Sequence, residues 1–251
     1  MSEATAFPNV RQWFGALLNR LERLQTDDYI VLKWELDNAS EEGQYRRDLG
    51  LLDSHIALAA EKCTAFSRLV KERSRPGRHI DSANRMILDK LAEIRAIAGL
   101  CEMGFVDIKH EGTPDLTVKK GPDTFAVEVT RLAAPSSQGP RPLVAVLPRG
   151  DASDNDLSVE IFNKVQAKQI QLVKSSPQLS HIVWVSLGRD YFTAGRYERS
   201  LTGLRRRMGG YTSGQLALAA ARVESELSYT QLSAIVLCLG RNESDLIAHI
   251  P

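Results

Sequence analysis

The chain has 251 residues, enough for one domain of ordinary size or for a domain with an appended region. Hydrophobic residues make up 43% and charged residues 25%, a soluble globular profile, and the net charge of +1 does not indicate a globally basic nucleic-acid-binding protein. No apolar run approaches the roughly 20 residues that cross a bilayer, and no signal peptide is evident, so we expect no membrane association. Three isolated cysteines, Cys63, Cys101 and Cys238, fit reduced thiols in a cytoplasmic protein.

Apolar residues repeat at helical spacing through the first eighty residues. They step by four and three from Val10 to Leu24, and a second apolar patch covers residues 29–36. A longer alternation of three and four predicts one helix with a heptad seam. The seam residues are Leu49, Leu52, Ile56, Ala59, Cys63, Phe66 and Val70. This seam packs either against the first helix, as an internal hairpin, or against a second copy of the chain in a homodimer.

The helical pattern ends at Pro76-Gly77, inside a basic stretch that contains Arg75 and Arg78. We therefore predict a helical region over residues 1–80 and an α/β core over residues 81–251.

Residues 91–130 hold the densest set of acidic candidates. A helix carries Glu93 and is followed by a strand-like run at 105–110. The turn at 112–114 then places Asp115 at the head of a second strand, and a third strand over 124–132 carries Glu128. Hard divalent cations require such oxygen ligands on rigid elements. The alternative is that Asp115 is an ordinary turn residue and Glu93 a solvated helix residue.

The third strand alternates in a way that makes its carboxylate conspicuous. Phe125, Val127 and Val129 belong to one face, whereas Ala126, Glu128 and Thr130 belong to the other. A central strand of a mixed sheet is covered on both faces, and a carboxylate buried there needs a partner.

Beyond this strand, residues 133–156 are rich in Pro, Ser, Gly and Asp, with one strand-like run at 143–147. They form either a substrate-facing loop or a disordered surface loop. A helix is predicted over 158–174, and Lys164, Lys168 and Gln171 line one edge of its apolar stripe.

The remaining elements are a buried strand at 181–187, a helix at 213–227 and a strand at 232–239. The order of helices and strands is that of an α/β protein. Between them, residues 196–210 form a basic cluster with neighbouring aromatic residues. This cluster either contacts a phosphate backbone or is a solvated charged face.

The ordered set of helix, Pro-Asp strand and acidic strand resembles the PD-(D/E)XK nuclease superfamily, which has the restriction-endonuclease-like fold. Glu93 is followed by Ala96, Leu100 and Gly104, as is common in that family's helix. Pro114-Asp115 follows, and thirteen residues later comes Glu128-Val129-Thr130, where the superfamily usually has Glu-x-Lys. The resemblance covers residues 81 to 251 and leaves the first eighty unexplained.

The resemblance implies an α/β, restriction-endonuclease-like core with a mixed central sheet flanked by helices, preceded by the N-terminal helical region. It further implies a Mg²⁺-dependent endonuclease, with Mn²⁺ as a possible substitute, that acts on DNA rather than RNA. Asp115, Glu128 and the carbonyl of Val129 would bind the ion, and Glu93 would bind the ion or a coordinated water. Arginine contacts with phosphates are expected from Arg205, Arg206 and Arg207, with Arg199, Arg75 and Arg78 as further candidates.

Thr130 occupies the position of the usual lysine. Some superfamily members carry this lysine on the following helix, where Lys168 lies nearer the apolar stripe than Lys164. Thr130 also favours an alternative, a catalytically inactive module of this fold that binds nucleic acid or a protein partner. A helical adaptor organised around the heptad seam is a third interpretation.

Overall fold

The computed structural model describes residues 6–22, 31–37, 43–71, 80–132, 154–187, 232–239 and 243–248. The chain divides into two compact units, Met1–His110 and Glu111–Pro251. A division at residue 80 was expected from the sequence and stays a prediction, whereas the two compact units are divided between His110 and Glu111. Among the described helices, none combines the length and apolar character needed to cross a membrane.

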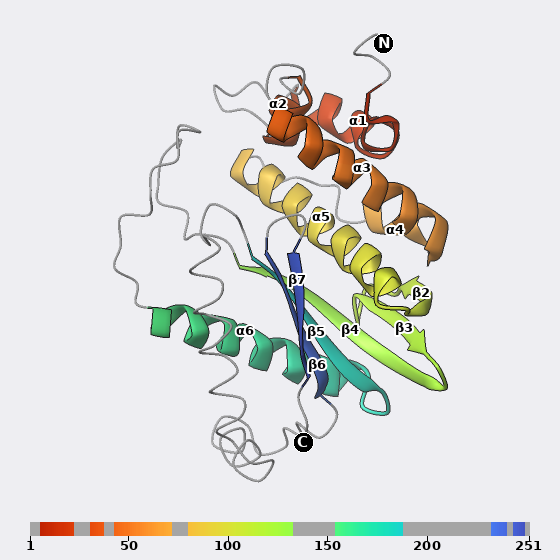
Figure 1. Ribbon diagram of the computed structural model, residues 1–251, viewed down its shortest axis with the longest axis vertical. Coiled ribbons are helices and arrows are strands. Elements are labelled where there is room, and N and C mark those ends of the chain that lie inside the picture. Colours follow the sequence, from red (N-terminus) through yellow and green to blue (C-terminus); the bar gives the residue numbers. More distant parts are fainter. Residues whose placement is uncertain are drawn as a thin grey trace. The chain divides into compact units, whose positions relative to one another are not determined.

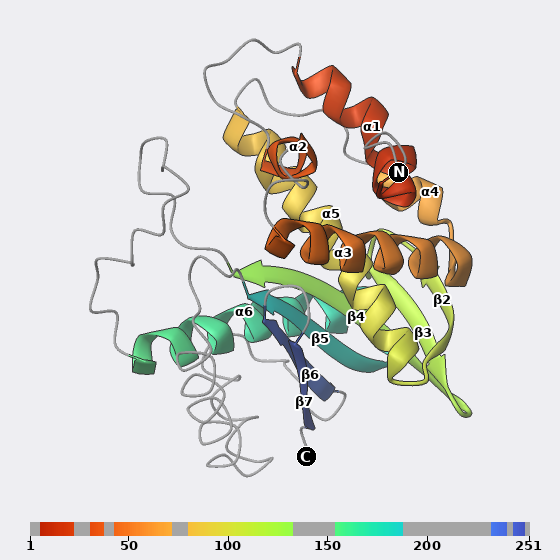
Figure 2. The ribbon, with the colours of Figure 1, turned by 45° about the horizontal axis from the view of Figure 1, so that its top comes forward.

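The first unit is mainly helical, and α3 lies between α1 and α5 (Figure 1). The same arrangement is visible from a second direction (Figure 2). Its elements are α1 (Pro8–Glu22), α2 (Val31–Asp37), α3 (Gly43–Lys62), β1 (Cys63–Thr64), α4 (Phe66–Lys71), α5 (Ile80–Glu102) and β2 (Val106–His110). All seven seam residues are at most 6% exposed within the single chain. Other parts of the same chain therefore cover the seam, as expected if it packs internally rather than against a second copy of the chain.

A side chain from α3 fixes the start of α1. Asp53 accepts hydrogen bonds from the backbone N–H of Val10 (2.9 Å) and from the side-chain amide of Asn9 (2.8 Å). The first N–H groups of a helix have no partner within the helix, and Pro8 at the first position lacks an N–H altogether. Asp53 thus caps α1 from a neighbouring helix.

The single helix predicted from Leu49 to Val70 is wrong in one respect, because it is interrupted at residues 63–65. Cys63 and Thr64 pair in parallel with Ile108 and Lys109 of β2. Ala65 then adopts a left-handed backbone conformation, with φ 66°, before α4 begins. The interruption keeps the seam residues buried, so the apolar pattern does not reveal it.

The second unit is α/β, with a mixed sheet and α6 packed against β4 and β5 (Figure 1). Its elements are β3 (Leu116–Lys120), β4 (Asp123–Leu132), α6 (Asp154–Ser175), β5 (Ser180–Leu187), β6 (Leu232–Leu239) and β7 (Glu243–Ala248). The strands lie side by side in chain order. β4, β5 and β6 are parallel to one another, whereas β3 and β7 are antiparallel to their neighbours.

The parallel strands are buried, as their branched side chains predict. In β4 the run from Ala126 to Val129 is buried, and in β5 the run from His181 to Ser186 is buried. The predicted strands at 181–187 and 232–239 are confirmed, whereas β7 was not predicted. The expected strand at 143–147 and helix at 213–227 lie outside the described residues.

Candidate functional site

Asp115 reaches the site from a tight loop between Glu111 and the start of β3. The N–H of Glu111 donates to the carbonyl of Asp115 (3.2 Å), which closes the loop. Gly112 has φ 90°, a conformation that a residue without a Cβ adopts readily. The hydroxyl of Thr113 donates to the carbonyl of Gly112 (2.7 Å), and the Thr113–Pro114 peptide is cis. Asp115 is therefore held directly before the first paired residue of β3.

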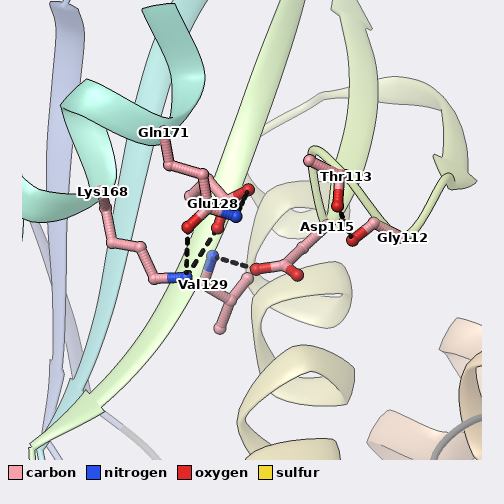
Figure 3. Close-up of polar contacts among 7 residues, drawn as sticks. All are labelled: Gly112, Thr113, Asp115, Glu128, Val129, Lys168 and Gln171. Atoms are coloured by element: carbon pink, nitrogen blue, oxygen red, sulfur yellow. Dashed lines mark hydrogen bonds and ion pairs between the residues drawn. The ribbon is translucent and has the colours of Figure 1, made fainter. Parts of the chain in front are cut away.

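The register of the β3–β4 hairpin brings Asp115 next to Glu128. Leu116 pairs with Val127, so the residue before Leu116 lies beside the one after Val127. Paired residues of an antiparallel sheet share a face, so both carboxylates belong to the same side. The carboxylate of Asp115 also accepts a hydrogen bond from the N–H of Val129 (2.8 Å; Figure 3).

Glu128 is fully buried, with 0% of its side chain exposed. Two residues of α6 bind its two carboxylate oxygens (Figure 3). The ammonium of Lys168 lies 2.7 Å from Oε2, and the amide of Gln171 donates to Oε1 (2.8 Å). Lys168 also donates to the amide oxygen of Gln171 (3.3 Å), so the three side chains form a closed ring of hydrogen bonds.

The pKa of Glu128 is raised even though Lys168 lies beside it. Burial of Glu128, followed by the charge of the neighbouring Asp115, raises the pKa of Glu128 to about 7. The hydrogen bond and the charge of Lys168 lower this pKa but do not restore the ordinary value. Glu128 is buried and Asp115 is half-buried, and a proton or a cation between two such neighbouring carboxylates relieves their repulsion.

This donor set fits a small divalent cation. The carboxylates of Asp115 and Glu128 are hard oxygen ligands. The N–H of Val129 points toward Asp115, and in a strand the carbonyl of the same residue points to the same edge. Within the described ranges there is no group of three or more His, Cys, Asp or Glu that could hold a metal. A cation there would therefore rest on two carboxylates, one backbone carbonyl and water.

A second, buried polar network fixes the end of α6 that carries Lys168 and Gln171. The amide of Gln169 donates to Nδ1 of His181 in β5 (2.9 Å), and Nε2 of His181 donates to the carbonyl of Ser176 (3.0 Å). Burial lowers the pKa of His181, in keeping with a neutral ring that both donates and accepts. The rotation of α6 relative to β4 and β5 is thereby set.

The structure brings together four of the residues singled out in the sequence: Asp115, Glu128, Val129 and Lys168. Glu93 belongs to the first unit, where its carboxylate lies 3.9 Å from Nδ1 of His110. Lys164 is exposed, one helical turn before Lys168.

The arginines expected to contact phosphates all lie outside the described residues: Arg75, Arg78, Arg199, Arg205, Arg206 and Arg207. Gln171 was not among the predicted site residues. The signal that points to it is its place on the edge of α6 that also carries Lys164 and Lys168.

Comparison of the chain with protein-family models, with curated proteins and with solved structures gave no match. Any functional assignment therefore depends on the geometry of the second unit.

Proposed function

We propose that the chain is a metal-dependent nuclease of restriction-endonuclease-like fold that hydrolyses phosphodiester bonds, in DNA rather than RNA. One observation carries the proposal: Asp115, directly before β3, lies beside Glu128 of β4, and Lys168 reaches Glu128 from α6 at 2.7 Å. Two carboxylates can hold a divalent cation for metal-assisted hydrolysis of a phosphodiester, and a lysine beside them can offset charge on the phosphate. The mixed sheet with α6 packed on it supports the same proposal.

Asp115 and Glu128 would hold Mg²⁺ or Mn²⁺, together with the carbonyl of Val129. A divalent cation in this position supplies a Lewis acid that lowers the pKa of water and neutralises charge on the phosphate. Burial and the charge of Asp115 raise the pKa of Glu128 to about 7, and a bound cation would stabilise the charged form of this carboxylate.

Lys168 would perform the two tasks of the lysine that is missing at Thr130. Its ammonium offsets negative charge on the phosphate, and it orients the attacking water. Two of its three N–H donors are used by Glu128 and Gln171. The third is left for a phosphate oxygen or the water. The side chain of Lys168 is 24% exposed, so it is not sealed inside the described part of the second unit.

The test is cleavage of single- and double-stranded DNA and RNA with Mg²⁺, Mn²⁺ or EDTA. Glu128→Gln and Asp115→Asn are expected to slow cleavage by at least about a hundredfold, or ~2.7 kcal/mol of barrier. Glu111→Gln, an exposed carboxylate in the neighbouring loop, is the matched control and is expected to cleave like the unmodified protein. Unchanged cleavage by Glu128→Gln contradicts the proposal.

A second candidate is a catalytically inactive module of the same fold that binds nucleic acid or a protein partner. Thr130 favours it, because no charged group stands at the usual lysine position of β4. This candidate predicts binding of nucleic acid in a gel-shift assay without cleavage under any metal condition.

A further inference from the structure

Gln171 stands between the two charged groups of the site and contacts both. Its amide nitrogen donates to Glu128 Oε1 (2.8 Å), and its amide oxygen accepts from Lys168 (3.3 Å). The two ends of the amide thus face charges of opposite sign, as their own polarity requires. A glutamine held in this way has one favourable orientation only.

Lys168 needs such a second acceptor. Its side chain is long and flexible, and 24% of it is exposed, so water competes for the ammonium. Glu128 accepts from only one of the three donors of Lys168, and the charge of Glu128 is shared as soon as any cation binds beside Asp115. The amide oxygen of Gln171 is neutral and is not one of the proposed metal ligands. It therefore continues to accept from the ammonium when Glu128 is engaged elsewhere.

We infer that Gln171 is a positioning residue, which holds Lys168 at the acidic pair and so lets a lysine on α6 replace the one missing from Thr130 of β4. The catalytic consequence of this inference rests on the proposed function, whereas the positioning itself does not.

The spacing on α6 supports this assignment. Lys168 and Gln171 are three residues apart, so their side chains emerge from one side of the helix. The buried contacts of Gln169 with His181 fix the same turn against β5. Lys164 lies on the same edge of α6 and is exposed. The residue three positions after it is Ala167, which has no amide to accept from its ammonium.

The experiment measures how fast an amine-reactive reagent labels Lys168 in the metal-free protein, by mass spectrometry of the peptides. Exposed Lys164 serves as the internal reference. In the unmodified protein Lys168 is expected to be labelled more slowly than Lys164. Gln171→Leu, which removes both contacts at similar size, is expected to bring Lys168 toward the rate of Lys164.

Gln166→Leu is the matched control, since it makes the same change at another half-buried glutamine of α6. Thermal melts establish that each variant is folded. If Lys168 is equally protected in Gln171→Leu and in the unmodified protein, the inference is wrong.

The labelling result separates this inference from the proposed function. If the unmodified protein cleaves, Gln171→Leu is expected to lose at least about tenfold in rate, which corresponds to ~1.4 kcal/mol. Full cleavage by that variant overturns the inference and leaves the nuclease proposal intact. If the unmodified protein does not cleave at all, the nuclease proposal fails, and the labelling rates still decide whether Gln171 positions Lys168.

Discussion

Replacing Glu128 with glutamine removes a buried negative charge while it preserves the shape of the side chain. In the folded protein, burial and the neighbouring Asp115 raise the pKa of Glu128 from its ordinary value of 4.5 to about 7. The folded state then binds a proton more tightly than the unfolded state does. The contribution of Glu128 to stability is therefore most favourable below pH 4.5 and is lost as the pH rises through 7.

The size of this effect follows from the two pKa values. They differ by about 2.5, and each pH unit corresponds to about 1.4 kcal/mol, so the charged carboxylate costs about 3 kcal/mol above pH 8. We expect Glu128→Gln to be more stable than the unmodified protein by up to that amount at about pH 8.5. The difference should shrink to less than about 1 kcal/mol at pH 5, where Glu128 is protonated in the folded state.

Urea unfolding at several pH values between about 5 and 8.5, in EDTA, measures the difference. Glu111→Gln, an exposed control, should change stability by no more than about 0.5 kcal/mol at any of these values. A destabilised Glu128→Gln at the alkaline end, or a difference that does not vary with pH, would show that Lys168 already neutralises Glu128. The reasoning that burial and the neighbouring Asp115 disfavour the charged form of Glu128 would then be refuted.

Three further outcomes follow from the contacts and charges. Lys168→Met should destabilise the protein at pH 8 by on the order of 2–3 kcal/mol in urea unfolding, because it leaves Glu128 buried without the ammonium beside it. Adding Glu128→Gln to this variant should remove most of the destabilisation. Asp53→Ala should lower the free energy of unfolding by about 1–2 kcal/mol, since the N–H of Val10 then lacks its acceptor. An unchanged melting temperature would contradict the capping role of Asp53. Replacing the arginines at 205–207 with alanine should reduce the slope of log K for DNA binding against log salt concentration by about 0.9 for each phosphate that is no longer neutralised. Binding titrations at several salt concentrations measure this slope, and an unchanged slope would mean that the three arginines do not contact phosphates.

Local signals predicted the second unit well. The hairpin of β3 and β4 is bounded by a turn rich in Gly and Pro, and the alternation in β4 places Glu128 on the face that α6 covers. The edge of the apolar stripe on α6 likewise pointed to Lys168, because a lysine beside buried residues can extend toward the sheet. These features depend on residues close together in the chain, which is why periodicity detects them.

Contacts between distant segments were not predictable in this way. The break at residues 63–65 exists because Cys63 pairs with Ile108, and no glycine or proline marks the left-handed Ala65. β7 forms only by pairing with β6 and has no clear alternation of its own. Gln171 looked like any polar residue at a helix edge, because its role depends on where Glu128 lies in the fold.

Thr130 is the position at which a lysine placed on β4 can be compared directly with the lysine on α6. It lies two residues beyond Glu128 on the same face of β4, about 7 Å along the strand, so a lysine there could extend its ammonium toward the acidic pair. If cleavage depends on an ammonium at that point rather than on α6 itself, Lys168→Met should lose activity and the double variant with Thr130→Lys should recover part of it. Cleavage rates at saturating Mg²⁺ measure the recovery, with thermal melts to verify folding. If the double variant folds but is no more active than Lys168→Met, then α6 supplies something more than the charge of its lysine. Gln171, which accepts a hydrogen bond from Lys168, would then be the first residue to examine.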